Sequence, residues 1–219
     1  MVYTGTMPRG EGRATKSARG NRKDAILDEA TRLFAERGYE GTSMADLAER
    51  VGLRKASLFH HFASKEELRR AVLSRLVMRV RTQLAAATTD MKSDGGFSKS
   101  IDAVTDAVIG LLGEQPYAAR LVLREAMEWD AASRDTLCEA FTESLQAGER
   151  FVTSAQKTGT CQAGDPKHIV ATLVGIHLLP FALGGVMERF TGHPPWSPSF
   201  IADRRSAVRD QVHALLLRR

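Results

Sequence analysis

Hydrophobic residues recur every three or four positions along most of the chain, the spacing that places side chains on one face of an α-helix. In the first third, this spacing predicts helices over 23–37, 44–51 and 55–62, followed by a long helix over 65–87. No segment shows the alternation of apolar and polar residues that is typical of a half-buried strand. The pattern therefore predicts an all-α fold.

The rest of the chain returns to the helical pattern after a polar segment, 88–96, that ends in two glycines. Further helices are expected over 101–112, 116–129, 141–152, from Asp165-Pro166 to about 189, and over 199–217. The long helix would join an N-terminal three-helix domain, 21–81, to a larger helical domain, 82–219.

Positive charge is concentrated at the N-terminal end. The chain has 31 Lys and Arg against 26 Asp and Glu, a net charge of +5. Residues 1–82 hold 17 basic and 10 acidic residues, or +7, so the remaining 137 residues carry −2. Residues 1–20 lack the apolar run of a secretory signal and are expected to form a flexible basic arm, either solvated or in contact with phosphates. The basic end is the candidate surface for a polyanion.

Residues 43–62 have the pattern of a helix-turn-helix. Ser43 and Asp46 have the spacing of a capping box at the start of the first short helix, and Gly52 supplies a tight turn before the second. This geometry lets the second helix enter a DNA major groove with its N-terminal residues facing the base edges.

The stretch from Thr42 to Leu68, TSMADLAERVGLRKASLFHHFASKEEL, closely resembles the DNA-binding segment of the TetR family of bacterial regulators, and so does Phe34 to Tyr39, FAERGY. Residue types match at fixed offsets across four helices, over roughly 21–81. The remaining chain is similar to that family only in helical character and length. The resemblance implies a homodimer that binds double-stranded DNA, by family habit a repressor that a small-molecule effector releases.

The resemblance also implies which side chains reach DNA. It gives phosphate contacts at the start of the helix over 44–51, base contacts at the start of the helix over 55–62, and DNA-backbone contacts near the start of the helix over 65–87. In that order the residues are Thr42 and Ser43; Lys55, Ala56 and Ser57; and His61 and Lys65. His60 belongs to the same candidate surface. The adjacent His60 and His61 do not suggest a metal site, because neighbours on a helix point about 100° apart and no third ligand is near.

Two residues depart from the family pattern. Arg54 stands where a small polar cap is usual, and Arg neither caps a helix well nor suits the positive end of its dipole. We therefore expect Arg54 to face a phosphate or a guanine edge. Phe59 stands where the family usually has Tyr, so it either packs on a thymine methyl group or joins the core.

Residues 169–187 contain no charged side chain over 19 positions, which is long enough to raise a transmembrane alternative. His177, Pro180 and the pair Gly184-Gly185 argue against it. A helix that is apolar all round is otherwise buried, most easily by a second subunit. The resemblance implies the same, with the last two helices, about 166–189 and 199–217, pairing across a dimer.

An effector cavity would lie among the helices from Phe97 to Val174. The residues that we single out for it, each of which could equally be plain core, are Met127, Trp129, Phe141, His177 and Phe181.

Other classes of function receive less support. There is no P-loop, GxSxG, HExxH or GxGxxG motif, so neither an enzyme nor a cofactor is expected. Cys138 and Cys161 have no metal-binding or disulfide spacing, which fits a reducing cytoplasm. Two alternatives stay open: a sequence-independent DNA-coating protein, which would lose nearly all binding as salt rises, and a membrane-anchored interaction protein.

Overall fold

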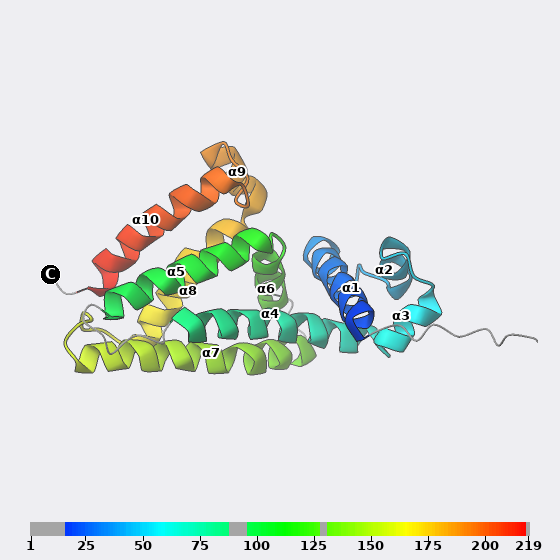
Figure 1. Ribbon diagram of the computed structural model, residues 1–219, viewed down its shortest axis with the longest axis horizontal. Coiled ribbons are helices and arrows are strands. Elements are labelled where there is room, and N and C mark those ends of the chain that lie inside the picture. Colours follow the sequence, from blue (N-terminus) through cyan, green and yellow to red (C-terminus); the bar gives the residue numbers. More distant parts are fainter. Residues whose placement is uncertain (1–15, 88–95, 128–130, 218–219) are drawn as a thin grey trace, which may run out of the picture.

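The computed structural model describes residues 16–87, 96–127 and 131–217, and these form an all-helical molecule (Figure 1). Within these ranges the only strand-like feature is an isolated antiparallel bridge between Cys161 and Leu217. The helices are α1 (Lys16–Arg37), α2 (Met44–Arg50), α3 (Lys55–His61), α4 (Lys65–Ala87), α5 (Gly96–Glu114), α6 (Ala118–Met127), α7 (Ala131–Lys157), α8 (Pro166–Ala182), α9 (Gly184–Thr191) and α10 (Pro198–Leu216).

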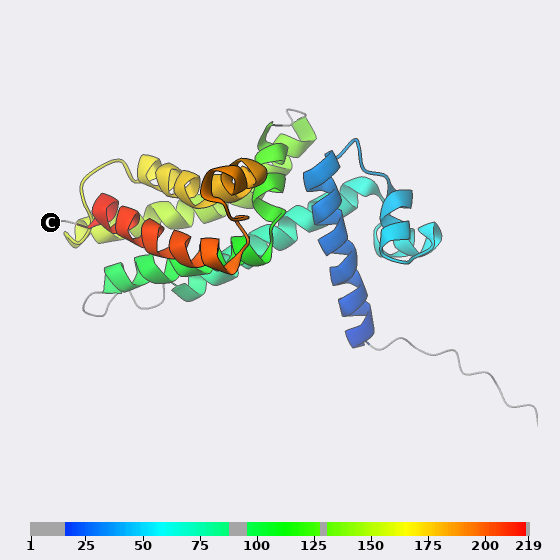
Figure 2. The same ribbon diagram turned by 90° about the horizontal axis from the view of Figure 1, so that it is seen from above.

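The first three helices pack with the start of α4 into a small domain at one end of the molecule (Figure 1). Its centre contains fully buried apolar side chains, among them Phe34, Leu47, Leu58 and Phe62. Burial of each such side chain contributes roughly 1.5–3 kcal/mol, so α2 and α3, at seven residues each, are held mainly by packing. The view from above shows α1 crossing the long α4 (Figure 2).

The remaining helices form the larger body. The second half of α4 runs beside α5 and α7, α10 packs on α5, and α8 packs on α7 (Figure 1). A second core cluster lies between these helices and includes Ile101, Ile109, Val152, Phe181 and Val208. Two packed centres are therefore linked by α4, as the sequence pattern predicts.

Helix α6 belongs by sequence to the larger domain predicted over 82–219, but it packs against both domains. Its residues Ala118 and Leu121 belong to the core of the N-terminal domain, whereas Ala119 belongs to the second core. Helix α6 also packs directly against α1. The N-terminal domain is therefore completed by a helix that lies far along the sequence.

Three predicted helices differ most from the structure in their boundaries. The first helix begins at Lys16 rather than 23, so 16–20 of the expected arm are helical, and 1–15 lie outside the described residues. The helix expected over 141–152 is the much longer α7. The apolar helix expected to run to about 189 stops at Leu183, where Pro180 and the pair Gly184-Gly185 weaken helix continuation.

Helix α9 leaves α8 at an angle of 81° and protrudes from the body (Figure 1). No single described helix is long and apolar enough to cross a membrane, and only the bent pair of α8 and α9 meets that test by length and composition.

Candidate nucleic-acid interface

The start of α2 is fixed by its N-cap. The hydroxyl oxygen of Ser43 accepts a hydrogen bond from the backbone N–H of Asp46 at 3.0 Å, and Ser43 is exposed. The Asp46 carboxylate lies 3.4 Å from Arg37. A capping Ser hydroxyl keeps its own proton to donate, so Ser43 presents a donor at the positive end of a helix. This is the arrangement expected of a phosphate contact.

Thr42 requires a correction. Its side chain is buried, and its hydroxyl donates a hydrogen bond of 2.8 Å to the carbonyl oxygen of Gly38. The single hydroxyl proton is therefore used to cap the end of α1 and is not presented to a phosphate. The local sequence could not distinguish Thr42 from Ser43, because both are small hydroxyl residues next to a helix start.

A tight turn sets the angle between α2 and α3. Gly52 adopts φ of +66°, a left-handed conformation that side-chain-bearing residues rarely adopt, and a Cβ there would meet nothing within 4 Å. The next N–H, of Leu53, donates to the carbonyl of Ala48 at 2.8 Å. The backbone conformation alone therefore explains the glycine.

The start of α3 is exposed and lacks a side-chain cap. Arg54 occupies the N-cap with extended backbone and makes no capping hydrogen bond. Lys55, Ala56 and Ser57 are exposed, while Leu58 one step further is fully buried. The helix is thus anchored from behind, with its first turn facing outward, which suits insertion into a major groove.

Phe59 does not join the core. Its side chain is 39% exposed, and the ammonium nitrogen of Lys55 lies 5.9 Å from the ring centroid. Between the two alternatives that the sequence left open, the exposed position is the observed one. A ring on the outer face of α3 adds an apolar contact surface next to a cation.

Lys65 is held against an aromatic ring at the start of α4. Its ammonium nitrogen lies 4.2 Å from the ring centroid of Tyr39 and 4.0 Å from the carboxylate of Glu40. His60 is exposed and His61 is half-buried. Ser64 caps the same helix by accepting from the N–H of Glu67 at 3.0 Å, so the start of α4 is fixed with three residues between it and the end of α3.

The residues singled out for an effector do not form one group. Met127 ends α6 and is 73% exposed, which argues against a place in an internal cavity, and Trp129 lies outside the described residues. Phe141 is half-buried on α7. His177 and Phe181 are buried one turn apart on α8.

Phe181 has a plain packing role. Its ring meets that of Phe200 edge to face at a centroid distance of 5.9 Å, which ties α8 to α10. The sequence pattern alone could not separate such a core contact from a ligand contact.

His177 is the one polar side chain of this set inside the core. Its Nδ1 lies 2.7 Å from the carbonyl oxygen of Leu173, so Nδ1 carries the donated proton, and Nε2 is a buried acceptor without a hydrogen-bond partner. Burial lowers the pKa of His177, the bond to Leu173 opposes this shift, and the charge of Arg204 adds to it. A neutral imidazole with a free acceptor can receive a hydrogen bond from a bound ligand.

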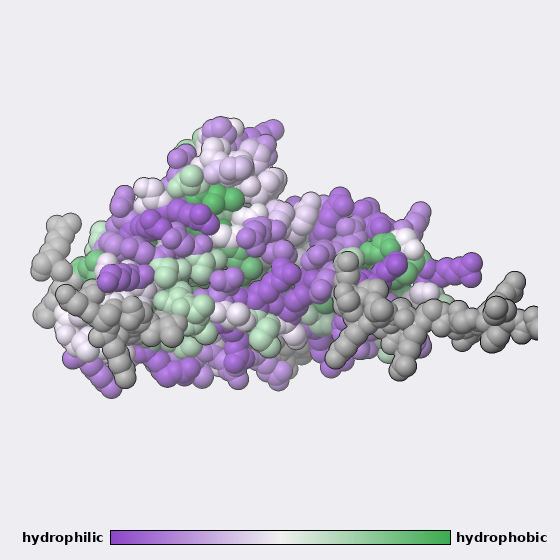
Figure 3. Space-filling view, viewed as in Figure 1, coloured by the Kyte–Doolittle hydropathy of each residue, from purple (hydrophilic) through white to green (hydrophobic). Residues whose placement is uncertain are grey.

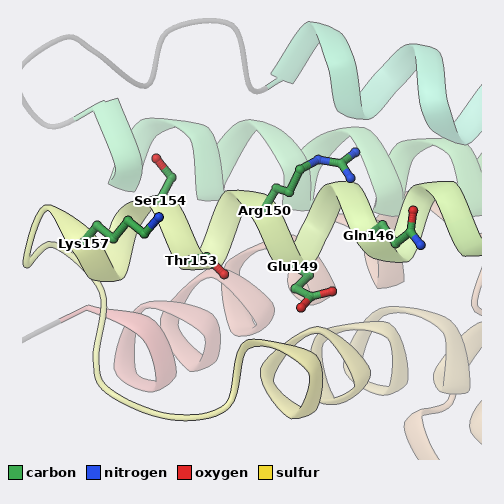
Figure 4. Close-up of a pocket in the computed structure, with 6 residues that line it drawn as sticks. All are labelled: Gln146, Glu149, Arg150, Thr153, Ser154 and Lys157. Atoms are coloured by element: carbon green, nitrogen blue, oxygen red, sulfur yellow. The ribbon is translucent and has the colours of Figure 1, made fainter.

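Two surface hollows lie elsewhere. One, of about 510 Å³, is lined from α7 alone, and Figure 4 shows its side chains: Gln146, Glu149, Arg150, Thr153, Ser154 and Lys157. The other, of about 370 Å³, lies between α4 and the end of α5. None of the four described effector candidates lines either of these two hollows.

Three residues that sequence reasoning did not single out lie next to the candidate interface. Tyr39 supports Lys65, Arg69 lies over the same ring at 4.4 Å, and Glu125 of α6 binds Arg69. An Arg and a Glu separated by 56 positions give no local signal, because only the tertiary fold brings them together.

Comparison with known proteins agrees with this geometry. Residues 26–72 match the family model of bacterial regulatory proteins, tetR family. The chain is 48% identical over 48 residues to the biofilm operon icaADBC HTH-type negative transcriptional regulator IcaR of Staphylococcus epidermidis. That match covers 22% of this chain and 26% of IcaR, so sequence similarity reaches about a quarter of the curated relative's length.

Similarity of fold extends over nearly the whole chain. The ketosteroid transcriptional regulator KstR2 of Mycobacterium tuberculosis superposes with a TM-score of 0.70 at 16% identity, covering 90% of this chain and 96% of KstR2. AibR, solved in complex with isovaleryl coenzyme A and operator DNA, gives 0.68 at 21% identity, with 89% and 97% covered. The sequence match lies in the N-terminal helices, where residues 26–72 are similar to the tetR family of bacterial regulatory proteins, and the match to the solved regulators shows that both domains share their fold.

Proposed function

We propose that the protein is a transcriptional regulator that binds a palindromic site in double-stranded DNA as a homodimer, represses transcription there, and is released by a small-molecule effector. The observation that carries the proposal is the exposed first turn of α3, with Arg54, Lys55 and Ser57 facing outward above the buried Leu58. It is supported by the similarity of the N-terminal helices to IcaR, a negative transcriptional regulator, and of the fold to AibR, which was solved with operator DNA.

The exposed residues divide into two kinds of contact. Those on the first turns of α3 would read bases, with Arg54 and Lys55 suited to guanine edges and Phe59 to a thymine methyl group. Those at helix starts or bearing donors would bind phosphates. The complete proposed surface comprises Ser43, Arg54, Lys55, Ala56, Ser57, Phe59, His60, His61 and Lys65.

Homodimerisation through α8 and α10 is proposed from an apolar face that the single chain leaves exposed. Val174 and Leu179 of α8 and Leu183 at its end are 44%, 49% and 39% exposed. Hydrophobic surface also lies at the foot of α9, where α10 begins (Figure 3). A second copy would cover this face and place two α3 helices on successive turns of the major groove, about 34 Å apart.

An effector would act from the larger domain. AibR, which shares this fold, was solved with isovaleryl coenzyme A and operator DNA, and this supports a small-molecule ligand for the present chain. We place the proposed contact at His177, because its Nε2 is a buried acceptor with no hydrogen-bond partner. A ligand group with an N–H or O–H would satisfy it. Residues 21–81 would then form the DNA-binding domain, and residues 82–219 the domain for effector binding and dimerisation, with α6 packed against both. The proposed regulator would act in the cytoplasm.

The test compares Lys55→Ala and Lys65→Ala on a DNA duplex selected by the wild-type protein and on a random duplex. Lys55→Ala should weaken binding to the selected duplex by roughly 5- to 150-fold and change binding to the random duplex far less. Lys65→Ala should weaken both alike, because a phosphate contact carries no base information.

The matched control is Lys157→Ala, which removes an equal charge at the far end of α7. It should leave both affinities unchanged. If Lys55→Ala weakened both duplexes equally, α3 would not read bases, and the protein would be a sequence-independent DNA-coating protein instead.

A further inference from the structure

A buried ion pair joins α6 to α4. The Nη2 and Nε atoms of Arg69 lie 2.6 and 2.8 Å from one carboxylate oxygen of Glu125. The two side chains are only 7% and 1% exposed. A buried pair of this kind contributes little net stability, but its geometry is strict, because a displaced partner would leave an uncompensated charge in the interior.

Helix α6 is also closely fitted to the N-terminal domain in the turn that precedes Glu125. Leu121 is buried in the core of that domain. The guanidinium of Arg124 lies so close to Gly38 that a Cβ there would come within 2.5 Å of it. Any displacement of α6 relative to α1 and α4 would therefore reach the Arg69–Glu125 pair.

The pair continues into the candidate DNA contact through Tyr39. The guanidinium carbon of Arg69 lies 4.4 Å from the Tyr39 ring centroid, and the Lys65 ammonium lies 4.2 Å from the same centroid. Lys65 and Arg69 are four residues apart on α4, so they share one face of the helix. Lys65 also lies 4.0 Å from the carboxylate of Glu40, whose side chain is 94% exposed, and such surface pairs contribute little.

We infer that Glu125, Arg69 and Tyr39 are positioning residues for DNA binding: they hold Lys65 in place for its phosphate and make that contact depend on the position of α6. The inference rests on the proposed function. It assigns a role to a buried charge pair that packing does not require, because an apolar pair of similar volume would fill the same space. It also gives the larger domain a direct route to the DNA contact.

The experiment replaces the ion pair by apolar residues, in the double variant Arg69→Met with Glu125→Leu. Thermal unfolding should show a melting temperature no lower than that of the wild type, because neither charge is left unpaired. DNA binding should nevertheless weaken on selected and random duplexes alike. The slope of log K against log salt should become shallower by about 2 per dimer, one phosphate contact for each protomer.

A double-mutant cycle identifies the route. If the pair acts through Lys65, adding Lys65→Ala to the double variant should cause no further loss of affinity and no further change of slope. The matched control is Arg75→Gln, which removes another α4 arginine that binds α1 through Asp28 at 2.7 Å. It should leave the salt slope unchanged.

An unchanged salt slope in the double variant, or losses that add fully to that of Lys65→Ala, would overturn the inference. Failure of the proposed function looks different, since the wild-type protein itself would then show no preference for any duplex.

Discussion

Arg204 of α10 donates from Nη2 to the carbonyl oxygen of Ile176 in α8 at 2.6 Å. This carbonyl would ordinarily accept from the N–H of residue 180, four positions on, but residue 180 is proline and has no N–H. Arg204 therefore supplies the hydrogen bond that Pro180 removes, and it joins the two helices proposed to form the dimer. Its burial lowers the pKa of Arg204.

Replacing Arg204 should lower the stability of the protein, because the carbonyl of Ile176 would then lose its hydrogen bond. Arg204→Met would leave a half-buried carbonyl without this partner and should lower the free energy of unfolding by about 1 kcal/mol. In a Pro180→Ala background the helix supplies its own N–H to Ile176, so the same substitution should cost much less. Urea unfolding of the wild type, Arg204→Met, Pro180→Ala and the double variant measures the cost of Arg204→Met in both backgrounds. Equal costs in the two backgrounds would show that Arg204 stabilises the protein in some other way.

The buried His177 should make stability depend on pH. Because burial lowers its pKa below the unfolded value of about 6.5, the unfolded chain binds the proton more readily. The contribution of His177 is therefore fully present above about pH 6.5 and is lost as the pH falls below it, with a slope of at most about 1.4 kcal/mol per unit.

Urea unfolding at pH 7.5, 6.5 and 5.5 tests this for the wild type and His177→Gln. The variant should lose less stability over this interval. His168→Gln, which removes an exposed histidine of the same helix, should behave like the wild type. Parallel curves for the wild type and His177→Gln would contradict the assignment.

The two cysteines should differ in reactivity. Cys138 is exposed, whereas Cys161 is buried, and burial raises the pKa of the Cys161 thiol. Since the thiolate is the reactive form, iodoacetamide at neutral pH should modify Cys138 first. Mass spectrometry of peptides before and after unfolding in urea would measure this order. Modification of Cys161 in the folded protein at the same rate would contradict its placement.

The exposed face of α8 should be required for self-association. Leu179→Glu would place two like charges at a symmetric interface and should raise the dimer dissociation constant on the order of 100-fold or more. Met78→Glu is the control, because Met78 is an equally apolar residue, 62% exposed, on α4. Sedimentation equilibrium measures both. A normal dimer with Leu179→Glu would place the interface elsewhere.

The sequence predicts the N-terminal domain well, because its signals are local. The spacing of Ser43 and Asp46 and the turn at Gly52 each depend on neighbours within a few residues, and the structure confirms both. The resemblance to the tetR family makes the prediction of a DNA-binding helix-turn-helix more specific, because the matched residue types fall at fixed offsets.

Contacts between residues far apart in the chain could not be predicted from local sequence patterns. The Arg69–Glu125 pair and the Arg204–Ile176 bond join positions 56 and 28 residues apart. Neither Arg69 nor Arg204 stands out in the sequence of its own helix, because an isolated Arg on a helix usually faces solvent. The break after α8 was also not predicted, since the apolar pattern continues through it and only the local chemistry of Pro180 and two glycines opposes helix formation.

We propose that the first turn of α3 reads DNA sequence. The most direct measurement incubates the purified protein with fragments of its own genome and sequences what stays bound at two salt concentrations. We predict that a few palindromic sites remain bound at the higher salt, while bulk fragments are lost. Uniform recovery at low salt that vanishes at higher salt would contradict the claim.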